Sequence, residues 1–167
     1  MPHEKKPLPI MSDDLWNFAV ACYAKPGVET ACLELQAAGA DVCLMLTGAW
    51  LDCSGIAPDE VRLAQLKEVS DDWRIQVVAP LRSLRQAWRE QAANDEELAA
   101  LRERVKKLEL NAEHIQFQRL QHAARHWTAD NRTVDWLERL GADLSGERHA
   151  SLETLRRAAA QLALGDD

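Results

Sequence analysis

The sequence predicts an all-α protein, a bundle of roughly seven helices in which two form a long αα-hairpin. Three observations support this fold class. Apolar residues recur at spacings of three and four along most of the chain, capping residues and prolines mark the beginnings of these segments, and no segment shows the alternation of a half-buried strand. A chain of 167 residues can also bury a core without disulfides or metal, so we expect a single domain.

The first residues are predicted to form a mobile arm over 1–11, followed by the helical domain over 12–167. Three prolines among the first nine residues favour an extended arm. Ser12 is a good N-cap, and apolar residues follow it at helical spacing. The first helix is expected to end near Tyr23.

Two more helices are predicted before residue 55. Pro26 and Gly27 interrupt the first pattern, because proline cannot continue a helix, and a second helix follows as far as Gly39. Asp41 can cap a third helix that ends near Gly55. This third helix is apolar nearly all round, so we expect it at the centre of the bundle.

The next segment predicts a fourth helix that begins at Pro58 and a fifth helix that Ser70 caps. The fourth would direct Val61, Ala64 and either Val69 or a neighbouring residue inward. Pro80 lies inside the fifth pattern and should kink or split it. The apolar residues of this fifth pattern are Trp73, Val77, Leu81, Leu84 and Trp88.

The longest helical pattern covers residues 95–127 and pairs with about 71–93 in the predicted hairpin. At ~1.5 Å per residue, this helix would be on the order of 50 Å long. The sequence leaves open whether its apolar seam closes within one chain or between two. The seam follows a coiled-coil heptad through Leu98, Leu101, Val105, Leu108, Ala112 and Ile115.

Two further helices are predicted after the hairpin. Residues 133–140 form a short helix that Gly141 stops. A last amphipathic helix carries its apolar stripe at Leu152, Leu155, Ala159 and Leu162.

Charge and hydropathy exclude several classes of partner. The formal net charge is −7 and the pI about 5.3, so a phosphate-binding surface would work against the overall field, and nucleic acid is not expected as a partner. The longest apolar run, 42–51, is shorter than the roughly 20 residues that cross a bilayer, so no membrane association is expected. The N-terminus lacks the apolar core of a signal peptide, and we expect a cytoplasmic protein with reduced thiols.

The four cysteines form two pairs with nine residues between the members of each pair, Cys22 with Cys32 and Cys43 with Cys53. This spacing is found in twin disulfide hairpins, but such a hairpin needs each pair on one helix. The break at Pro26 separates the first pair, and the close pairs of a four-cysteine zinc site are absent. We therefore interpret the cysteines as free thiols that pack as small hydrophobic residues.

Residues 15–51, LWNFAVACYAKPGVETACLELQAAGADVCLMLTGAWL, contain a string of short motifs. They resemble an uncharacterised family of small proteobacterial helical proteins, known as a domain of unknown function. Met45 departs from its pattern, and 77–89 resembles its second shared block. The resemblance implies a bacterial cytoplasmic helical protein and carries over no catalytic residue. The family signature reads L-W-x-F-A, Y-A-x-P-G-V, A-C-L-x-L-Q, D-V-x-x-L-L and W-L, here at Leu15–Ala19, Tyr23–Val28, Ala31–Gln36, Asp41–Leu46 and Trp50–Leu51.

Two histidines are the weak candidates for a metal site. His122 and His126 lie one helical turn apart, a spacing that lets two imidazoles bind one ion. The glutamate of the H-E-x-x-H motif is absent, and further ligands would have to come from Glu113, His114 or Asp130. We expect a surface or interface role for the pair, no metal and no cofactor.

A basic stripe and one tryptophan are the candidates for ligand or partner binding. Arg82, Arg85 and Arg89 are spaced by three and four residues and can hold a phosphate, a carboxylate or an acidic helix. Alternatively they form a solvated face paired with acids of the next helix, Glu96, Glu97 and Glu103. Trp127 is a candidate for a groove or an interface, where tryptophan is enriched.

No phosphate-binding glycine loop, dinucleotide fingerprint or nucleophile elbow occurs, so no catalytic residue is assigned and an enzyme is not favoured. The leading hypothesis is a cytoplasmic, non-enzymatic interaction protein, an adaptor or regulator that uses the long heptad helix to bind a protein partner or a second copy. The alternative is a helical bundle that binds a small anionic ligand through Arg82, Arg85 and Arg89. A hydrolytic metal site at His122 and His126 is the third hypothesis.

Overall fold

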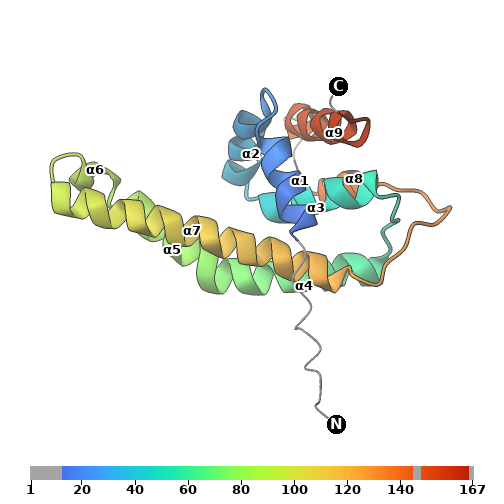
Figure 1. Ribbon diagram of the computed structural model, residues 1–167, viewed down its shortest axis with the longest axis horizontal. Helices are drawn as coiled ribbons and strands as arrows, with labels where there is room; N and C mark the ends of the chain where they lie inside the picture. Colours follow the sequence, from blue (N-terminus) through green and yellow to red (C-terminus); the bar gives the residue numbers. More distant parts are fainter. Residues whose placement is uncertain (1–12, 145–147, 166–167) are drawn as a thin grey trace, which may run out of the picture.

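The protein is all-α, as predicted, and no strand occurs among the residues that the computed structural model describes, 13–144 and 148–165. The predicted N-terminal segment 1–11 and its neighbour Ser12 lie outside the described residues. In chain order the helices are α1 Asp14–Tyr23, α2 Val28–Ala37, α3 Val42–Cys53, α4 Glu60–Trp73, the π-helix η1 Arg74–Val78, α5 Ala79–Ala87, α6 Arg89–Ala92, α7 Glu96–Ala123, α8 Trp136–Leu140 and α9 His149–Ala163 (Figure 1).

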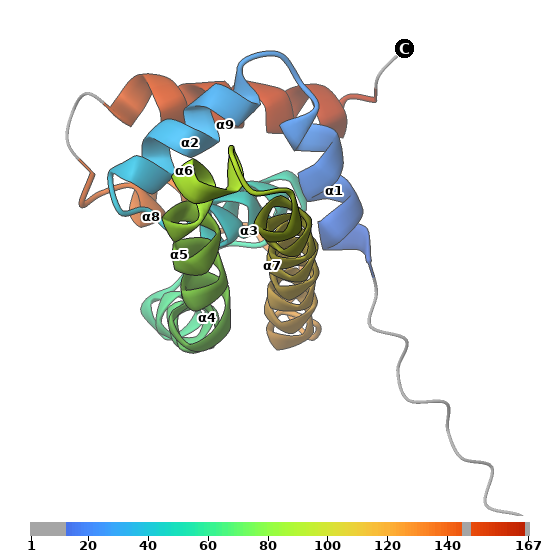
Figure 2. The same cartoon turned by 90° about the vertical axis from the view of Figure 1, so that its left-hand side faces the viewer.

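The described residues form a globular part and a projecting arm (Figures 1 and 2). The globular part holds α1, α2, α3, α8 and α9. The arm is an antiparallel pair in which α4, η1, α5 and α6 follow one another along one leg and α7 returns along the other. The predicted long hairpin is therefore present, and its first leg begins at the start of α4.

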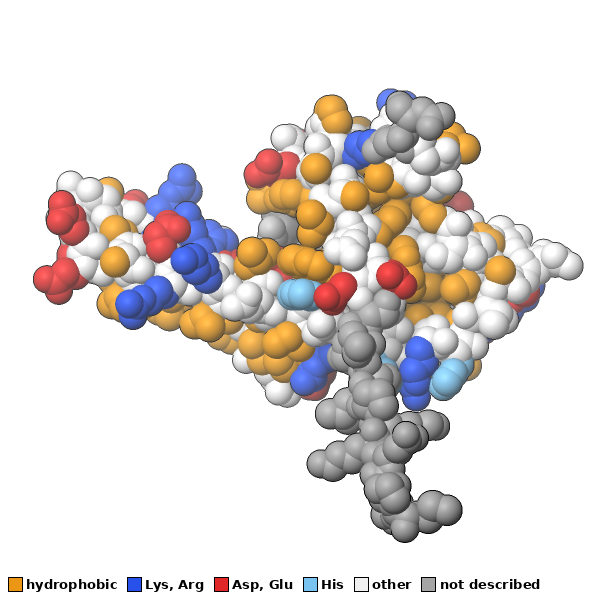
Figure 3. All heavy atoms as spheres, viewed as in Figure 1, with side chains coloured by type: hydrophobic (Ala, Val, Ile, Leu, Met, Phe, Trp, Pro, Cys, Tyr) orange, Lys and Arg blue, Asp and Glu red, His pale blue; other side chains and the backbone are white. Residues whose placement is uncertain are grey.

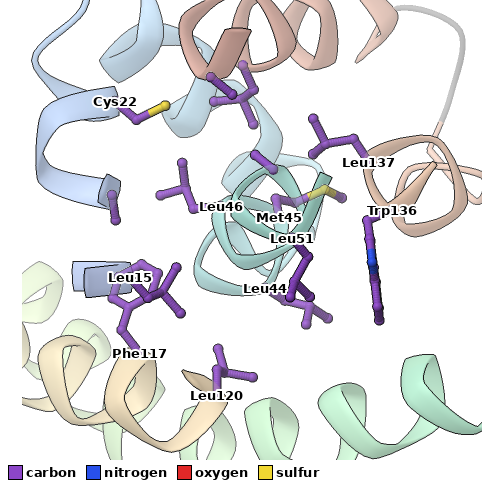
Figure 4. Close-up of a cluster of buried hydrophobic side chains, with 14 of the residues drawn as sticks. Leu15, Cys22, Leu44, Met45, Leu46, Leu51, Phe117, Leu120, Trp136 and Leu137 are labelled. Carbon is purple, nitrogen blue, oxygen red and sulfur yellow. The ribbon is translucent and has the colours of Figure 1, made fainter. Parts of the chain in front are cut away.

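Helix α3 is the central element, as its all-round apolar sequence predicted. It contacts every other helix of the globular part and also α4 and α7. Figure 4 shows its apolar residues between two walls, with Leu15, Phe117 and Leu120 on one side and Trp136 and Leu137 on the other. The predicted cap is confirmed, because the Asp41 carboxylate accepts a hydrogen bond from the Leu44 backbone N–H at 3.1 Å.

Glycine allows α8 to lie close to this central helix. A Cβ atom on Gly48 would be 2.7 Å from Leu140 Cδ1 and 3.3 Å from Trp136 Cβ. Gly141 directly follows the end of α8, as predicted, and it also serves close packing, since its φ is −91° and an added Cβ would meet Leu152 at 2.5 Å.

A side chain from α3 caps the short helix α8. Asp52 accepts hydrogen bonds from the backbone N–H groups of Trp136 at 2.7 Å and Leu137 at 3.2 Å. Asp135, at the N-cap position itself, makes no capping hydrogen bond. The helix begins three residues later than predicted because its first turn is fixed by this tertiary contact.

The predicted cap at Ser70 was wrong. Ser70 is completely buried inside α4, which continues through η1 into α5 without a break. Its hydroxyl donates to the Asp41 carboxylate at 2.5 Å, so the polar side chain has a tertiary partner and does not end a helix. The inward direction of Val61 and Ala64 was also wrong, since both are exposed and Leu66 is buried in their place.

Pro80 does not split the first leg of the arm, which stays helical from α4 through η1 into α5. It lies in the first turn of α5, directly after η1. Proline lacks an N–H and disturbs the α-helical hydrogen bonds of the preceding turn, and the wider π-helical turn takes up that disturbance. The leg therefore remains continuous.

The second leg, α7, has 28 residues and so is on the order of 40 Å long. It begins where predicted, with the Asp95 side chain accepting from the Leu98 backbone N–H at 3.1 Å. It ends at Ala123, four residues before the predicted end at Trp127.

The four cysteines are free thiols, as predicted. Cys22 and Cys32 are buried, and burial raises their thiol pKa values to about 11 and about 12. Such thiols are poor nucleophiles at neutral pH, because the reactive species is the thiolate.

Candidate functional site

The heptad residues of α7 divide into two sets. Val105 and Ala112 are buried and Leu98 is half-buried, so this set lies along the packed side of the helix. Helix α7 packs against α4, η1, α5 and α6 of the first leg. The other three residues, Leu101, Leu108 and Ile115, are exposed by 48%, 53% and 38%. We call these three residues the α7 stripe.

The α7 stripe lies on one flank of the arm. Leu108 lies roughly 100° around the helix from Glu109, which points toward α5. On α5, Leu84 is also exposed, and it lies on the side of Arg85 away from Arg82. Figure 3 shows hydrophobic side chains along one edge of the arm and lysine and arginine side chains along the other.

The two legs are joined by a partly buried ionic cluster. Arg82 Nε lies 3.0 Å from Glu109 Oε1, and its Nη2 lies 3.1 Å from Glu113 Oε1. Arg85 Nε lies 2.5 Å from Glu109 Oε2. Burial acts to raise the pKa of Glu109, but the hydrogen bonds from Arg85 and Arg82 outweigh it and hold this pKa below its ordinary value. Burial raises the pKa of Glu113, with Arg82 opposing.

The three residues of the predicted arginine stripe have different surroundings. Arg82 and Arg85 pair with acids of the next helix, as one alternative anticipated, but the acids are Glu109 and Glu113. Arg89 is exposed at the beginning of α6, beyond the end of α5. Two of the three guanidinium groups therefore already have carboxylate partners within the chain.

The Trp127 side chain packs against residues of its own chain. It is half-buried and stacks on the fully buried Trp136, with ring centroids 5.8 Å apart and planes 13° apart. The Arg62 guanidinium lies 5.1 Å from the centre of the Trp127 ring. Trp127 thus covers the core beside α8.

The two candidate metal ligands are not on one helix. His122 is in the last turn of α7 and His126 lies beyond its end, and both are exposed. Among residues 13–144 and 148–165, no group of three histidine, cysteine or acidic side chains is placed to hold a metal ion. His114, named as a further ligand, lies 2.9 Å from Asp13 and stacks on Trp16.

A polar chain that sequence reasoning missed connects the arm to the globular part. Gln116 of α7 donates to the Ser70 hydroxyl at 2.8 Å, and Ser70 donates to Asp41. Arg74 Nε lies 3.6 Å from the same carboxylate oxygen, Asp41 Oδ2. Burial raises the Asp41 pKa, with the Ser70 hydrogen bond opposing. Only the spatial arrangement of three helices brings these residues together.

A pocket with a volume of about 360 Å³ lies next to this chain of polar groups, and we call it the junction pocket. Side chains from α1, α2, α3, η1, α5 and α7 line it. Its apolar walls include Trp16 and Phe117. The polar lining side chains are Tyr23, Gln36, Asp41, Cys43, Arg74, Arg82, Glu113 and Gln116.

The chain is a member of the family described as "Protein of unknown function (DUF2390)", whose model matches residues 14–120, more than half of the chain. The α7 stripe and the junction pocket both lie within the matched residues, whereas α8 and α9 lie outside them. No curated protein and no solved structure matches the chain.

Within the described part of the chain, no helix has the length and apolar character needed to cross a membrane.

Proposed function

We propose that this protein is a non-enzymatic interaction protein, an adaptor or regulator, that acts as an antiparallel dimer formed through the α7 stripe. The observation that carries the proposal is the exposure of three large apolar residues at seven-residue spacing on one flank of a long helix. The occupant of the stripe is the same stripe of a second copy.

Single exposed leucines need no explanation, but this arrangement is continuous. Residues seven apart stay on nearly the same face, with a drift of about 20° per heptad. Leu101, Leu108 and Ile115 therefore form one line along the helix, and a facing helix of the same spacing buries all three. Each Å² of apolar surface removed from water contributes about 25 cal/mol.

The charges at the ends of the stripe favour an antiparallel second copy. Glu97 and Arg119 flank the stripe, and each lies eleven residues from Leu108. A two-fold axis at Leu108 places Leu101 opposite the partner's Ile115 and Glu97 opposite the partner's Arg119. A parallel pair would place like charges together at both ends, which is unfavourable.

Arg119 is already held near that end of the stripe. Its guanidinium lies 4.0 Å from the centre of the Trp73 ring, and the Trp73 indole N–H donates to the Ala112 carbonyl at 2.8 Å. Fixing a long side chain in advance reduces the entropy lost on pairing.

Light scattering after size exclusion tests the proposal. Wild type is expected to be dimeric at micromolar concentration, and Leu108→Lys monomeric. The matched control is Leu110→Lys, because Leu110 has the same 53% exposure but lies roughly 160° around α7 from Leu108. A wild-type protein that stays monomeric at all concentrations would contradict the proposal, as would equal disruption by both variants.

A cytoplasmic location is part of the proposal, supported by the four free thiols, which suit a reducing compartment. The proteobacterial origin implied by the motifs at 15–51 is likewise an inference. Cell fractionation of the native host with an antibody against the protein tests the location. Recovery in the periplasmic or secreted fraction would contradict it.

The anion-binding alternative through Arg82, Arg85 and Arg89 is the weaker proposal. Two of the three guanidinium groups already pair with Glu109 and Glu113. An added anion would have to displace these carboxylates.

A further inference from the structure

The junction pocket lies on the other flank of α7 from the α7 stripe. Leu110 lines the pocket and lies roughly 160° around the helix from Leu108. The volume of about 360 Å³ is near the lower end of the range of small-molecule sites, ~300–1,000 Å³. A small ligand there would leave the α7 stripe accessible, so this inference does not rest on the proposed dimer.

The rim of the junction pocket is apolar and exposed to solvent. Val20 and Tyr23 of α1, Leu33 of α2 and Leu110 of α7 all line it, and each is exposed by more than a third of its surface. Three separate helices thus direct large apolar side chains to one hollow. Apolar side chains gathered in this way, in contrast to single scattered ones, are typical of a binding site.

The walls inside the rim are also mainly apolar. Phe117 of α7 is buried and Trp16 of α1 is half-buried, and the centres of their rings are 5.9 Å apart. Leu46 of α3 and Val78, the last residue of η1, are buried and line the pocket as well. π-Helical turns are rare and occur often at functional sites. The interior therefore offers an apolar molecule close contact on several sides.

The charged side chains that line the pocket form two opposed pairs. Arg82 Nη2 lies 3.1 Å from Glu113 Oε1, and Arg74 Nε lies 3.6 Å from Asp41 Oδ2. Arg74 Nη2 also lies 3.1 Å from Asp71, which is outside the lining. Each charged side chain of the lining therefore already has a partner of opposite charge in the described part of the chain.

This pairing selects an uncharged ligand. A charged group brought into the pocket would lose its water and meet like charges as well as opposite ones, so its burial would cost free energy without a partner of its own. An uncharged molecule avoids that cost and gains from contact with the apolar walls and rim.

We propose that the junction pocket binds a small, uncharged, predominantly apolar molecule. The bound molecule contacts Trp16 and Phe117 inside the pocket and covers Val20, Leu33 and Leu110 at the rim.

Calorimetric titration with 4-phenylbutan-1-ol tests the proposal, with 4-phenylbutanoate and 4-phenylbutylamine as probes of the same carbon skeleton and opposite charges. We expect saturable binding of the alcohol at one site per chain, and at least tenfold weaker binding of the anion and of the cation. Absence of alcohol binding, or binding of either charged probe within tenfold of the alcohol, would overturn the proposal.

Glu113→Gln tests the role of the paired charges. Removal of this carboxylate leaves an excess positive charge at Arg82, so the affinity for 4-phenylbutanoate relative to the alcohol should rise. Glu103→Gln is the matched control, because Glu103 is an exposed acid of the same helix outside the pocket, and it should leave this ratio unchanged. A ratio that does not rise in Glu113→Gln would refute selection by the paired charges and with it the proposal.

Two lysine variants locate the site. Leu110→Lys places a charge at an exposed position of the rim, so the fold should be retained while the affinity for the alcohol falls at least fivefold. Leu108→Lys makes the same change on the opposite flank, at the same 53% exposure, and should leave this affinity unchanged, whether or not the protein is a dimer. The dimer is expected to respond to these variants in the reverse order, so the two proposals fail independently. Alcohol binding that both variants weaken equally, or that neither weakens, would contradict the site proposed.

Discussion

Individual atoms determine how closely the helices of the globular part approach. Gly48 and Gly141 sit where an added methyl group would meet a neighbouring leucine. Polar residues are equally constrained, since Glu109, Ser70 and Gln116 are buried and each has a partner on another helix. A single substitution at one of these positions should therefore disturb one defined contact between helices.

Gly48→Ala is expected to destabilise the protein by about 1–3 kcal/mol, because its Cβ would lie 2.7 Å from Leu140 Cδ1. Chemical denaturation monitored by tryptophan fluorescence measures the change. The control is the Leu140→Ala background, in which the main clash is absent and the added methyl group should cost less. Equal cost in both backgrounds would show that the clash is not the cause.

Glu109→Gln is expected to lower the free energy of unfolding by about 2 kcal/mol at pH 7, because Arg82 and Arg85 lose their shared carboxylate. The folded pKa of Glu109 is lowered, so its stabilisation is present above the ordinary glutamate range and is lost as the pH falls through the folded value. The difference in free energy of unfolding between wild type and Glu109→Gln should therefore become smaller in acid.

Urea unfolding of both proteins at pH 7 and at about pH 3 measures this gap. The matched control is Glu103→Gln, since Glu103 is an exposed acid paired with Lys106 on the same helix. Such a pair contributes about 0.5 kcal/mol or less. A gap that is the same at both pH values would argue against an ionised, arginine-bound Glu109.

At the scale of elements, the sequence predicted those helices whose ends have local causes. Asp41 caps α3 as expected, and Asp95 caps α7 at the predicted start of that helix, because an N-cap uses only its own first turn. Ser70 has the same local signature but lies inside α4, because its hydroxyl finds Asp41, far away in the sequence. Local patterns cannot report such a partner.

Helix α8 depends on a residue of another element. Asp52→Ala is expected to cost about 1–2 kcal/mol, because two backbone N–H groups lose their acceptor, and to speed hydrogen exchange in α8. Asp135→Ala is the control, since Asp135 holds the N-cap position without a capping hydrogen bond. If Asp135→Ala proves as costly as Asp52→Ala, the cap does not come from α3.

The candidate site also depends on how two helices pair, which local sequence patterns do not report. The heptad spacing correctly identified the apolar residues of α7, but the sequence did not tell which half stays exposed. That division depends on the register of the hairpin, which places Arg85 beside Glu109 and not beside Glu103. The junction pocket was not foreseen because its residues come from six elements.

At the scale of the whole molecule, the arm gives the protein two separate flanks. One flank carries the α7 stripe, and the other faces the junction pocket and the globular part. An antiparallel dimer would use the first flank and leave the second open in both copies. The central claim is therefore the register of this dimer, with Leu108 on the two-fold axis.

Cysteine cross-linking tests that register most directly, in a Cys53→Ser background that removes the exposed native thiol. In a glutathione redox buffer, Leu108→Cys alone should form a disulfide-linked dimer, because the two residues 108 face each other within disulfide reach. Leu101→Cys alone should not cross-link, but Leu101→Cys mixed with Ile115→Cys should. Cross-linking of Leu101→Cys with itself, or no cross-linking of Leu108→Cys, would contradict the antiparallel dimer.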